Sequence, residues 1–335
     1  MSTAASEATL IIAPRVIYAG FWRRVAAAFI DSLTIGLVGF LLGLFLGEMF
    51  ARMGDAGRLA GLVIAAAYLI PAYSVLMDGR TLGKRLLGLR VQGVDGNAVS
   101  LERATVRYLV LAVPLLANGV FIAQDAVPGW AVMALGVVLA TVVFGGLLGN
   151  TYLLLFNLPS RRLLHDLAAN TVVVRANAAR AFDESMQFQA KHAIALIGLP
   201  LTVVGCLFVV GKLATGRYPQ LERLQKVQIA VSARPNVVSV GVNDMHQILN
   251  GTSANVLQLT VRVASWPSDT ENTALGYFVI VAKTFPDFVS RDRISVTLKS
   301  GYEIGIASKW RGSTYSHTPQ EWGRLAAGGK QSTGT

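Results

Sequence analysis

The chain has 335 residues, of which 53 % are hydrophobic and only 15 % are charged. So small a share of charge argues against a wholly soluble protein and indicates a membrane protein with a soluble appendage. The net charge of +11 comes mostly from short basic clusters beside apolar stretches, with no stacking aromatics among them, so we expect no nucleic-acid partner. The single cysteine, Cys206, excludes a disulfide within one chain.

The first apolar stretch contains a carboxylate, Asp31, seven residues after Arg24. Seven residues are about two helical turns, so both side chains fall on nearly the same face, about 10 Å apart along the axis. A carboxylate inside a membrane helix costs about 2.5–3.5 kcal/mol and therefore needs a partner, a proton or a watery cavity. Two interpretations follow: an ion pair that locks helices together, or a polar site on the path of a substrate or proton.

Five apolar stretches are long enough to cross about 30 Å of hydrocarbon. They are predicted at residues 25–47, 59–77, 108–124, 130–156 and 193–213. The loops on one side of these spans hold fourteen Lys and Arg residues, three before the first span, six after the second and five after the fourth, against two on the other side. The positive-inside rule then places the N-terminus in the cytoplasm. Five crossings put the C-terminal segment outside.

Glycines recur at intervals of four on the first span, at Gly39, Gly43 and Gly47. At this spacing they share one helix face and let another backbone approach closely. We expect a packing seam here, and one use of such a seam is a homo-oligomer.

The connection between the second and third spans predicts β structure. Strand-like runs at 86–91 and 99–101 flank Asp95-Gly96, a hairpin signal. A further strand-like run, 171–175, follows the fourth span on the same side. We expect a small cytoplasmic β-element against the membrane. Basic side chains near it are expected to bind anionic lipid headgroups, namely Arg80, Lys84 and Arg85.

The C-terminal part of the chain has the composition of a soluble α+β domain. Helices are predicted at 218–231 and 270–285, the second capped by Ser268 or Asp269. Strands are predicted at 237–242, 256–263, 294–298 and 302–307, with a hairpin at 299–301 between the last two. Aromatic side chains in this domain could pack its core or bind an envelope protein or glycan; they are Tyr302, Trp310, Tyr315 and Trp322.

The predicted fold is therefore a membrane bundle of five helices with a small soluble α+β domain. Its parts are a membrane domain over 1–180, a linker and the fifth span over 181–215, the exterior domain over 216–325 and a disordered tail over 326–335.

Four segments, in order, resemble the RDD family of bacterial membrane proteins. They are Tyr18–Asp31, Asp78–Val91, Asp95–Arg107 and Arg162–Val174. The resemblance covers about residues 15–176, and the family is named for one arginine and two aspartates. Arg24 and Asp31 match the arginine and the first aspartate, and Asp166 corresponds to the second. The resemblance implies an integral, multi-pass protein of a bacterial inner membrane, for which a role in transport has been suggested.

Opposite charges are predicted to gather near the cytoplasmic ends of the spans and to form a linked network. Its members are Arg24, Asp31, Asp78, Lys84, Arg85, Arg107 and Asp166. Losing one partner of a buried pair typically costs about 3–5 kcal/mol. Such a network either holds the fold alone or also handles an ion or ligand.

The sequence lacks the common signatures of catalysis. None of its four histidines has a second ligand three or four residues away, and no phosphate-binding loop or nucleophile elbow occurs. We therefore expect no enzymatic activity, no metal and no cofactor. The leading hypothesis is movement of an ion or small solute, with Asp31 as the protonatable group, Arg24 as its tuning partner and an exterior recognition domain. The alternative is a non-transporting scaffold or sensor subunit that displays the exterior domain to an envelope partner.

Overall fold

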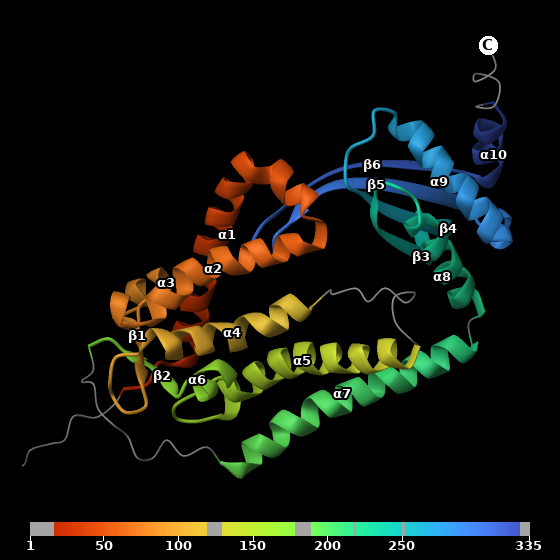
Figure 1. Ribbon diagram of the computed structural model, residues 1–335. Coiled ribbons are helices and arrows are strands. Elements are labelled where there is room, and N and C mark those ends of the chain that lie inside the picture. The colour runs from red at the N-terminus through yellow and green to blue at the C-terminus, as the bar shows by residue number, and fades with distance from the viewer. Residues whose placement is uncertain (1–16, 119–128, 178–188, 218, 250–251, 329–335) are drawn as a thin grey trace, which may run out of the picture. The chain divides into compact units, whose positions relative to one another are not determined.

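The computed structural model describes residues 17–118, 129–177, 189–217, 219–249 and 252–328. Contacts between residues divide the chain into two compact units (Figure 1). The first unit contains the chain up to residue 37 together with 62–205, and the second contains 38–61 together with the chain from 206 onward. The first long helix, α1 (Phe21–Arg52), therefore contributes to both units.

Helices dominate the described residues that precede the C-terminal domain. After α1 they are α2 (Gly57–Tyr73), α3 (Leu82–Leu86), α4 (Leu101–Ala117), α5 (Gly129–Phe156), α6 (Leu164–Ala168) and α7 (Ala190–Arg217). Four helical segments are long and apolar enough to cross a membrane, at 21–52, 54–73, 130–156 and 190–211. A lipid bilayer is thus the environment of this part of the chain.

These four segments coincide with the first, second, fourth and fifth predicted spans. The third predicted span, 108–124, overlaps α4, which begins where the Ser100 hydroxyl accepts the N–H of Arg103 at 3.3 Å. Residues 119–128 lie outside the described part of the chain. The helical membrane part is confirmed, and a total of five spans stays a prediction.

A two-stranded sheet joins distant parts of the first unit. Strand β1 (Leu89–Gly93) pairs antiparallel with β2 (Thr171–Arg175), so that Leu89 lies opposite Arg175. The predicted hairpin around Asp95-Gly96 is therefore wrong, although the chain does turn there. Residues 99–101 form no strand, because Ser100 caps α4 instead.

The C-terminal domain is a four-stranded sheet with helices packed on it (Figure 1). Its strands are β3 (Val237–Leu249), β4 (Thr252–Val263), β5 (Arg293–Glu303) and β6 (Ser308–His317), in the order β3-β4-β5-β6. Strands β4 and β5 run parallel, and the other pairs are antiparallel. The helices are α8 (Pro219–Ser232), α9 (Thr270–Thr284) and α10 (Pro319–Gly328). An α+β domain at the C-terminal end is thus confirmed.

Two details of this domain differ from the sequence-based expectation. The hairpin predicted at 299–301 is displaced, because β5 runs on to Glu303 and the chain turns at residues 304–307. Gly301 lies within the ladder opposite Trp310, where a Cβ would overlap the carbonyl oxygen of Lys309. The start of the tail predicted to be disordered, 326–328, belongs to α10, and residues 329–335 lie outside the described chain.

The aromatic side chains of this domain serve mainly as core. Trp322 is buried, stacks on Phe278 with ring centroids 4.9 Å apart, and donates its indole N–H to the carbonyl oxygen of Ile294 at 2.9 Å. Tyr302 is also buried, whereas Trp310 is exposed and lies under the guanidinium of Arg262. An envelope partner at these residues stays a prediction.

Candidate functional site

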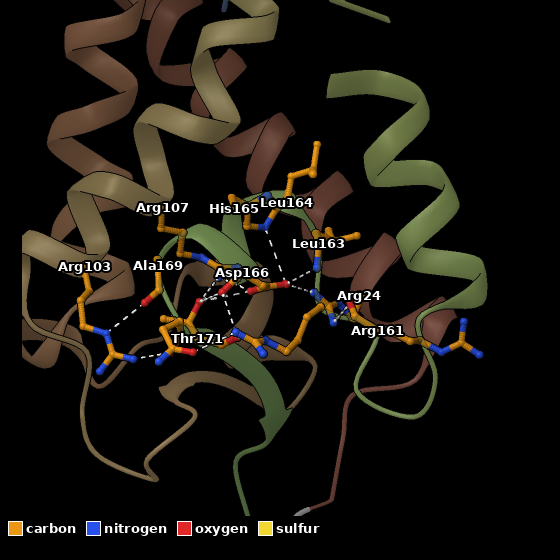
Figure 2. A network of polar contacts seen from close by, with 12 residues as sticks. Arg24, Arg103, Arg107, Arg161, Leu163, Leu164, His165, Asp166, Ala169 and Thr171 are labelled. Atoms are coloured by element: carbon orange, nitrogen blue, oxygen red, sulfur yellow. Dashed lines mark hydrogen bonds and ion pairs between the residues drawn. The ribbon is translucent and has the colours of Figure 1, made fainter. Parts of the chain in front are cut away.

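The first part of the site is built around the carboxylate of Asp166, which lies in α6 and is completely buried (Figure 2). One of its oxygens accepts a hydrogen bond from Arg24 Nη2 at 2.6 Å and one from the backbone N–H of Leu163 at 3.0 Å. Its other oxygen pairs with Arg107 and accepts the Thr171 hydroxyl at 3.4 Å. Four donors therefore surround this carboxylate, about the number it can accommodate.

These contacts join four separated segments of the first unit. Arg24 comes from α1, Arg107 from α4, and Thr171 from β2 (Figure 2). Arg24 also donates to the carbonyl oxygens of Arg161, at 2.7 Å, and Ser160, at 3.3 Å, in the loop before α6. Asp166 thus ties the start of the first membrane helix to the segment that follows α5.

The second part of the site is built around Asp31 on α1, which is 5 % exposed. One of its oxygens accepts the backbone N–H of Gly83 at 2.8 Å and the Tyr68 hydroxyl at 3.3 Å. The other accepts the Thr81 hydroxyl at 2.6 Å and Lys84 Nζ at 3.4 Å. This carboxylate, too, has two donors on each oxygen.

The short helix α3 approaches α1 closely because residue 83 is glycine. A Cβ on Gly83 would overlap the carbonyl oxygen of Ala27 and would lie 3.0 Å from an oxygen of Asp31. Thr81 has a double role, since its hydroxyl accepts the backbone N–H of Lys84 as helix cap and donates to Asp31.

The ring of Tyr73 links the two carboxylate clusters. Lys84 Nζ, from the Asp31 cluster, lies 4.9 Å from the ring centroid. The guanidinium carbon of Arg107, from the Asp166 cluster, lies 4.9 Å from the same centroid. Both approaches are cation–π contacts, so a single aromatic ring stabilises a cation from each cluster.

Burial and neighbouring charge shift the pKa values of the cluster residues outside the membrane helices. Burial lowers the pKa of Lys84 to about 8, although the charge of Asp31 opposes this. Burial alone would raise the pKa of Asp166, but the charges of Arg107 and Arg24 outweigh it and hold this pKa well below its usual range. Burial, reinforced by Arg107, lowers the pKa of His165 to about 3, so this imidazole is neutral near pH 7.

The structure brings together five of the seven residues predicted to form the network: Arg24, Asp31, Lys84, Arg107 and Asp166. Asp78 forms a partly exposed pair with Arg80 at 2.9 Å, and Arg85 is exposed. Because Lys84 is 8 % exposed and turned toward Asp31, it does not face lipid headgroups as predicted. Headgroup binding by Arg80 and Arg85 stays a prediction.

One predicted pairing is wrong. Arg24 is bonded to Asp166 and not to Asp31, whose cation is Lys84. The seven-residue spacing explains the difference, because side chains about 10 Å apart along a helix cannot meet directly. Arg24 and Asp31 therefore pair with different residues, each with one that packs beside its own position on α1.

Sequence reasoning missed the uncharged members of the site. They are Tyr68, Tyr73, Thr81, Gly83 and Thr171. Thr81 could have been found as the cap of a short helix that begins at Leu82, whereas the place of Tyr73 between two cations depends on the tertiary fold. Among the described residues, no three His, Cys, Asp or Glu side chains gather in a way that could hold a metal ion.

The long apolar helices and the buried charge clusters define a multi-pass membrane protein. The family model described as the RDD family matches residues 18–170, and this match confirms the resemblance seen in the sequence for this part of the chain. The matched residues include both carboxylates, Asp31 and Asp166, and the C-terminal α+β domain lies beyond them. No curated protein and no solved structure matches the chain.

Replacing Asp166 by asparagine should strongly destabilise the protein. The variant Asp166→Asn leaves the guanidinium groups of Arg24 and Arg107 buried without their carboxylate, a loss that typically costs about 3–5 kcal/mol. The loss of stability is measured as the shift of the thermal unfolding midpoint of the purified protein in detergent. The matched control is Asp78→Asn, which breaks an exposed pair worth up to about 1 kcal/mol. Equal unfolding midpoints for Asp166→Asn and Asp78→Asn would contradict a stabilising role of the buried Asp166 pairs.

The shifted pKa of Lys84 predicts a pH dependence of stability. The folded-state pKa is about 8, against 10.5 for an ordinary lysine. Between these values the unfolded state binds more protons than the folded state, so stability rises with pH in this window and is constant below it. The unfolding midpoint of the wild type should therefore rise relative to that of Lys84→Met from about pH 8 to about pH 10. A difference independent of pH would show that Lys84 does not titrate in this way.

Proposed function

We propose that this chain is a non-enzymatic membrane scaffold or sensor subunit that displays its C-terminal domain to a partner outside the cytoplasm. In this proposal the charge clusters fasten the membrane helices together and do not conduct a substrate. The observation that carries it is the saturation of both carboxylates by donors of the protein itself.

A carboxylate that handles a moving ion must exchange its partners for that ion or for water. Asp31 already has two protein donors on each oxygen, including the backbone N–H of Gly83. Asp166 is bonded in the same way, with Arg24 and Arg107 as its charged partners. Removing these donors would leave buried polar groups without partners, which costs about 1–3 kcal/mol each and more for a charged group. This cost favours a fastening role.

The proposed orientation rests on the distribution of basic residues. The fourteen-to-two excess of Lys and Arg on one side of the spans favours a cytoplasmic N-terminus. With a crossing at residues 108–124, the C-terminal domain then faces outward from a bacterial inner membrane.

Transport of a proton or small solute is the second candidate function. It is favoured by the burial of Lys84 beside Asp31, which lowers the pKa of Lys84 to about 8 and lets the ammonium partner of Asp31 release its proton close to physiological pH. In that mechanism the ion pair of Asp31 and Lys84 would open and close as the lysine titrates.

Cysteine labelling tests the orientation. With Cys206 replaced by alanine, single cysteines are placed at two exposed positions, Lys283→Cys in α9 and Asn97→Cys in the turn before α4. A maleimide that does not cross the inner membrane should label position 283 in spheroplasts and position 97 only after lysis. Labelling of position 97 in intact spheroplasts, or of position 283 only after lysis, would contradict the orientation.

Flux in liposomes separates the two functions. Liposomes that carry purified wild type, Asp31→Asn or Asp78→Asn are exposed to sodium, potassium and proton gradients. If the protein is a scaffold, we expect the ion flux of all three proteins to be no larger than that of protein-free liposomes. We also expect Asp31→Asn to be less thermally stable than Asp78→Asn, because only Asp31 is buried. Flux by the wild type and by Asp78→Asn that disappears in a folded Asp31→Asn variant would overturn the scaffold and establish transport.

A further inference from the structure

Five glycines lie on the two helices of the hairpin formed by the end of α1 and the start of α2. They are Gly39, Gly43 and Gly47 on α1 and Gly57 and Gly61 on α2. We call these five residues the glycine face. Contacts place this hairpin, residues 38–61, in one compact unit with the C-terminal domain.

The end of β5 and the connection that follows it, residues 302–307, occupy the glycine face. A Cβ on Gly43 would overlap the hydroxyl of Tyr302, and one on Gly61 would overlap the carbonyl oxygen of Ile304. A Cβ on Gly39 would lie 2.9 Å from Cγ1 of Ile306. The close approach of this segment therefore requires glycine at Gly43 of α1 and at Gly61 of α2.

The contact has an apolar centre. Tyr302 is 3 % exposed and Ile304 is completely buried. The ring of Tyr302 meets that of Phe50 from α1 edge to face, with centroids 5.5 Å apart. Edge-to-face packing of this kind adds stability beyond the area that it buries.

Ion pairs also connect the α1–α2 hairpin with the C-terminal domain, and their side chains are more exposed than the apolar centre. Arg58, next to Gly57 on α2, pairs with Glu303 at 3.2 Å. Asp55, in the turn between α1 and α2, pairs with Arg262 of β4 at 2.9 Å. An apolar centre with polar pairs around it is the usual anatomy of a specific docking interface.

We propose that the glycine face is a docking groove for residues 302–307 of the same chain, and that this contact fixes the C-terminal domain on the first helical hairpin. A homo-oligomer through Gly39, Gly43 and Gly47 would need the face that the turn occupies. The docking contact and such an oligomer therefore exclude each other. The proposal holds whether the protein is a scaffold or a transporter.

Disulfide formation tests which segment occupies the groove. In the full-length protein with Cys206 replaced by alanine, we would introduce Gly39→Cys with Ala307→Cys. An ideal Cβ at position 39 lies 3.0 Å from Cβ of Ala307, so a small adjustment allows a disulfide. The control pair is Gly39→Cys with Lys283→Cys, whose second cysteine is exposed on α9.

Mild oxidation in membranes should convert the test pair, and not the control pair, into an internally linked monomer that reductant restores. A disulfide-linked dimer would overturn the proposal, because a second copy would then cover the glycine face. Free cysteines at both positions after oxidation, detected by maleimide labelling, would also overturn it.

Single alanine substitutions give an independent test. Gly61→Ala places a methyl group against the backbone of Ile304, whereas Gly198→Ala, on α7, meets nothing within 4 Å. Alanine is the better helix former, so propensity alone would stabilise both variants. We expect Gly61→Ala to lower the unfolding midpoint in detergent and to slow the disulfide reaction by about tenfold or more, while Gly198→Ala does neither. Equal behaviour of the two variants would contradict the docking contact.

Discussion

The burial of two carboxylates is the constraint on which the membrane domain depends. A buried carboxylate is tolerated only when positive charge and hydrogen-bond donors replace its hydration. Asp166 obtains them from α1, α4, β2 and the backbone that opens α6, and Asp31 obtains them from α2, α3 and the residue that caps α3. Each carboxylate thereby fixes the relative position of segments that are far apart in the sequence.

The same requirement explains the short elements between the membrane helices. The helices α3 and α6 have five residues each, too few to be stable alone. Each has a backbone N–H at its start bonded to one of the buried carboxylates, Gly83 to Asp31 and Leu163 to Asp166. Strand β1 follows α3 and strand β2 follows α6, so the pairing of β1 with β2 joins the two short helices to each other. The charge clusters and the β-element therefore form one connected layer.

Much of this arrangement could be predicted from the sequence. Hydropathy identified four membrane helices, and charges within or beside apolar stretches identified Arg24, Asp31, Lys84, Arg107 and Asp166 as a cluster. Which cation pairs with which carboxylate could not be predicted, because this depends on which segment packs beside Arg24 and which packs beside Asp31 on α1. A local turn signal misled in the same way, because the hairpin expected after β1 gives way to a partner strand about 80 residues later. The glycines of α1 do form a packing seam, but its partner lies about 260 residues later in the chain, which their spacing does not reveal.

Hydrogen–deuterium exchange in the segments 81–86 and 163–168 tests most directly whether the two carboxylates are sealed by the protein. If the protein seals both carboxylates, the amides of Gly83 and Leu163 exchange slowly in the wild type. We also expect Asp31→Ala to accelerate exchange in the first segment much more than in the second. Rapid exchange at Gly83 in the wild type would mean that the hydrogen bonds of Asp31 open and that water replaces its protein donors. A site that passes ions or protons needs that replacement, and a fastening site does not.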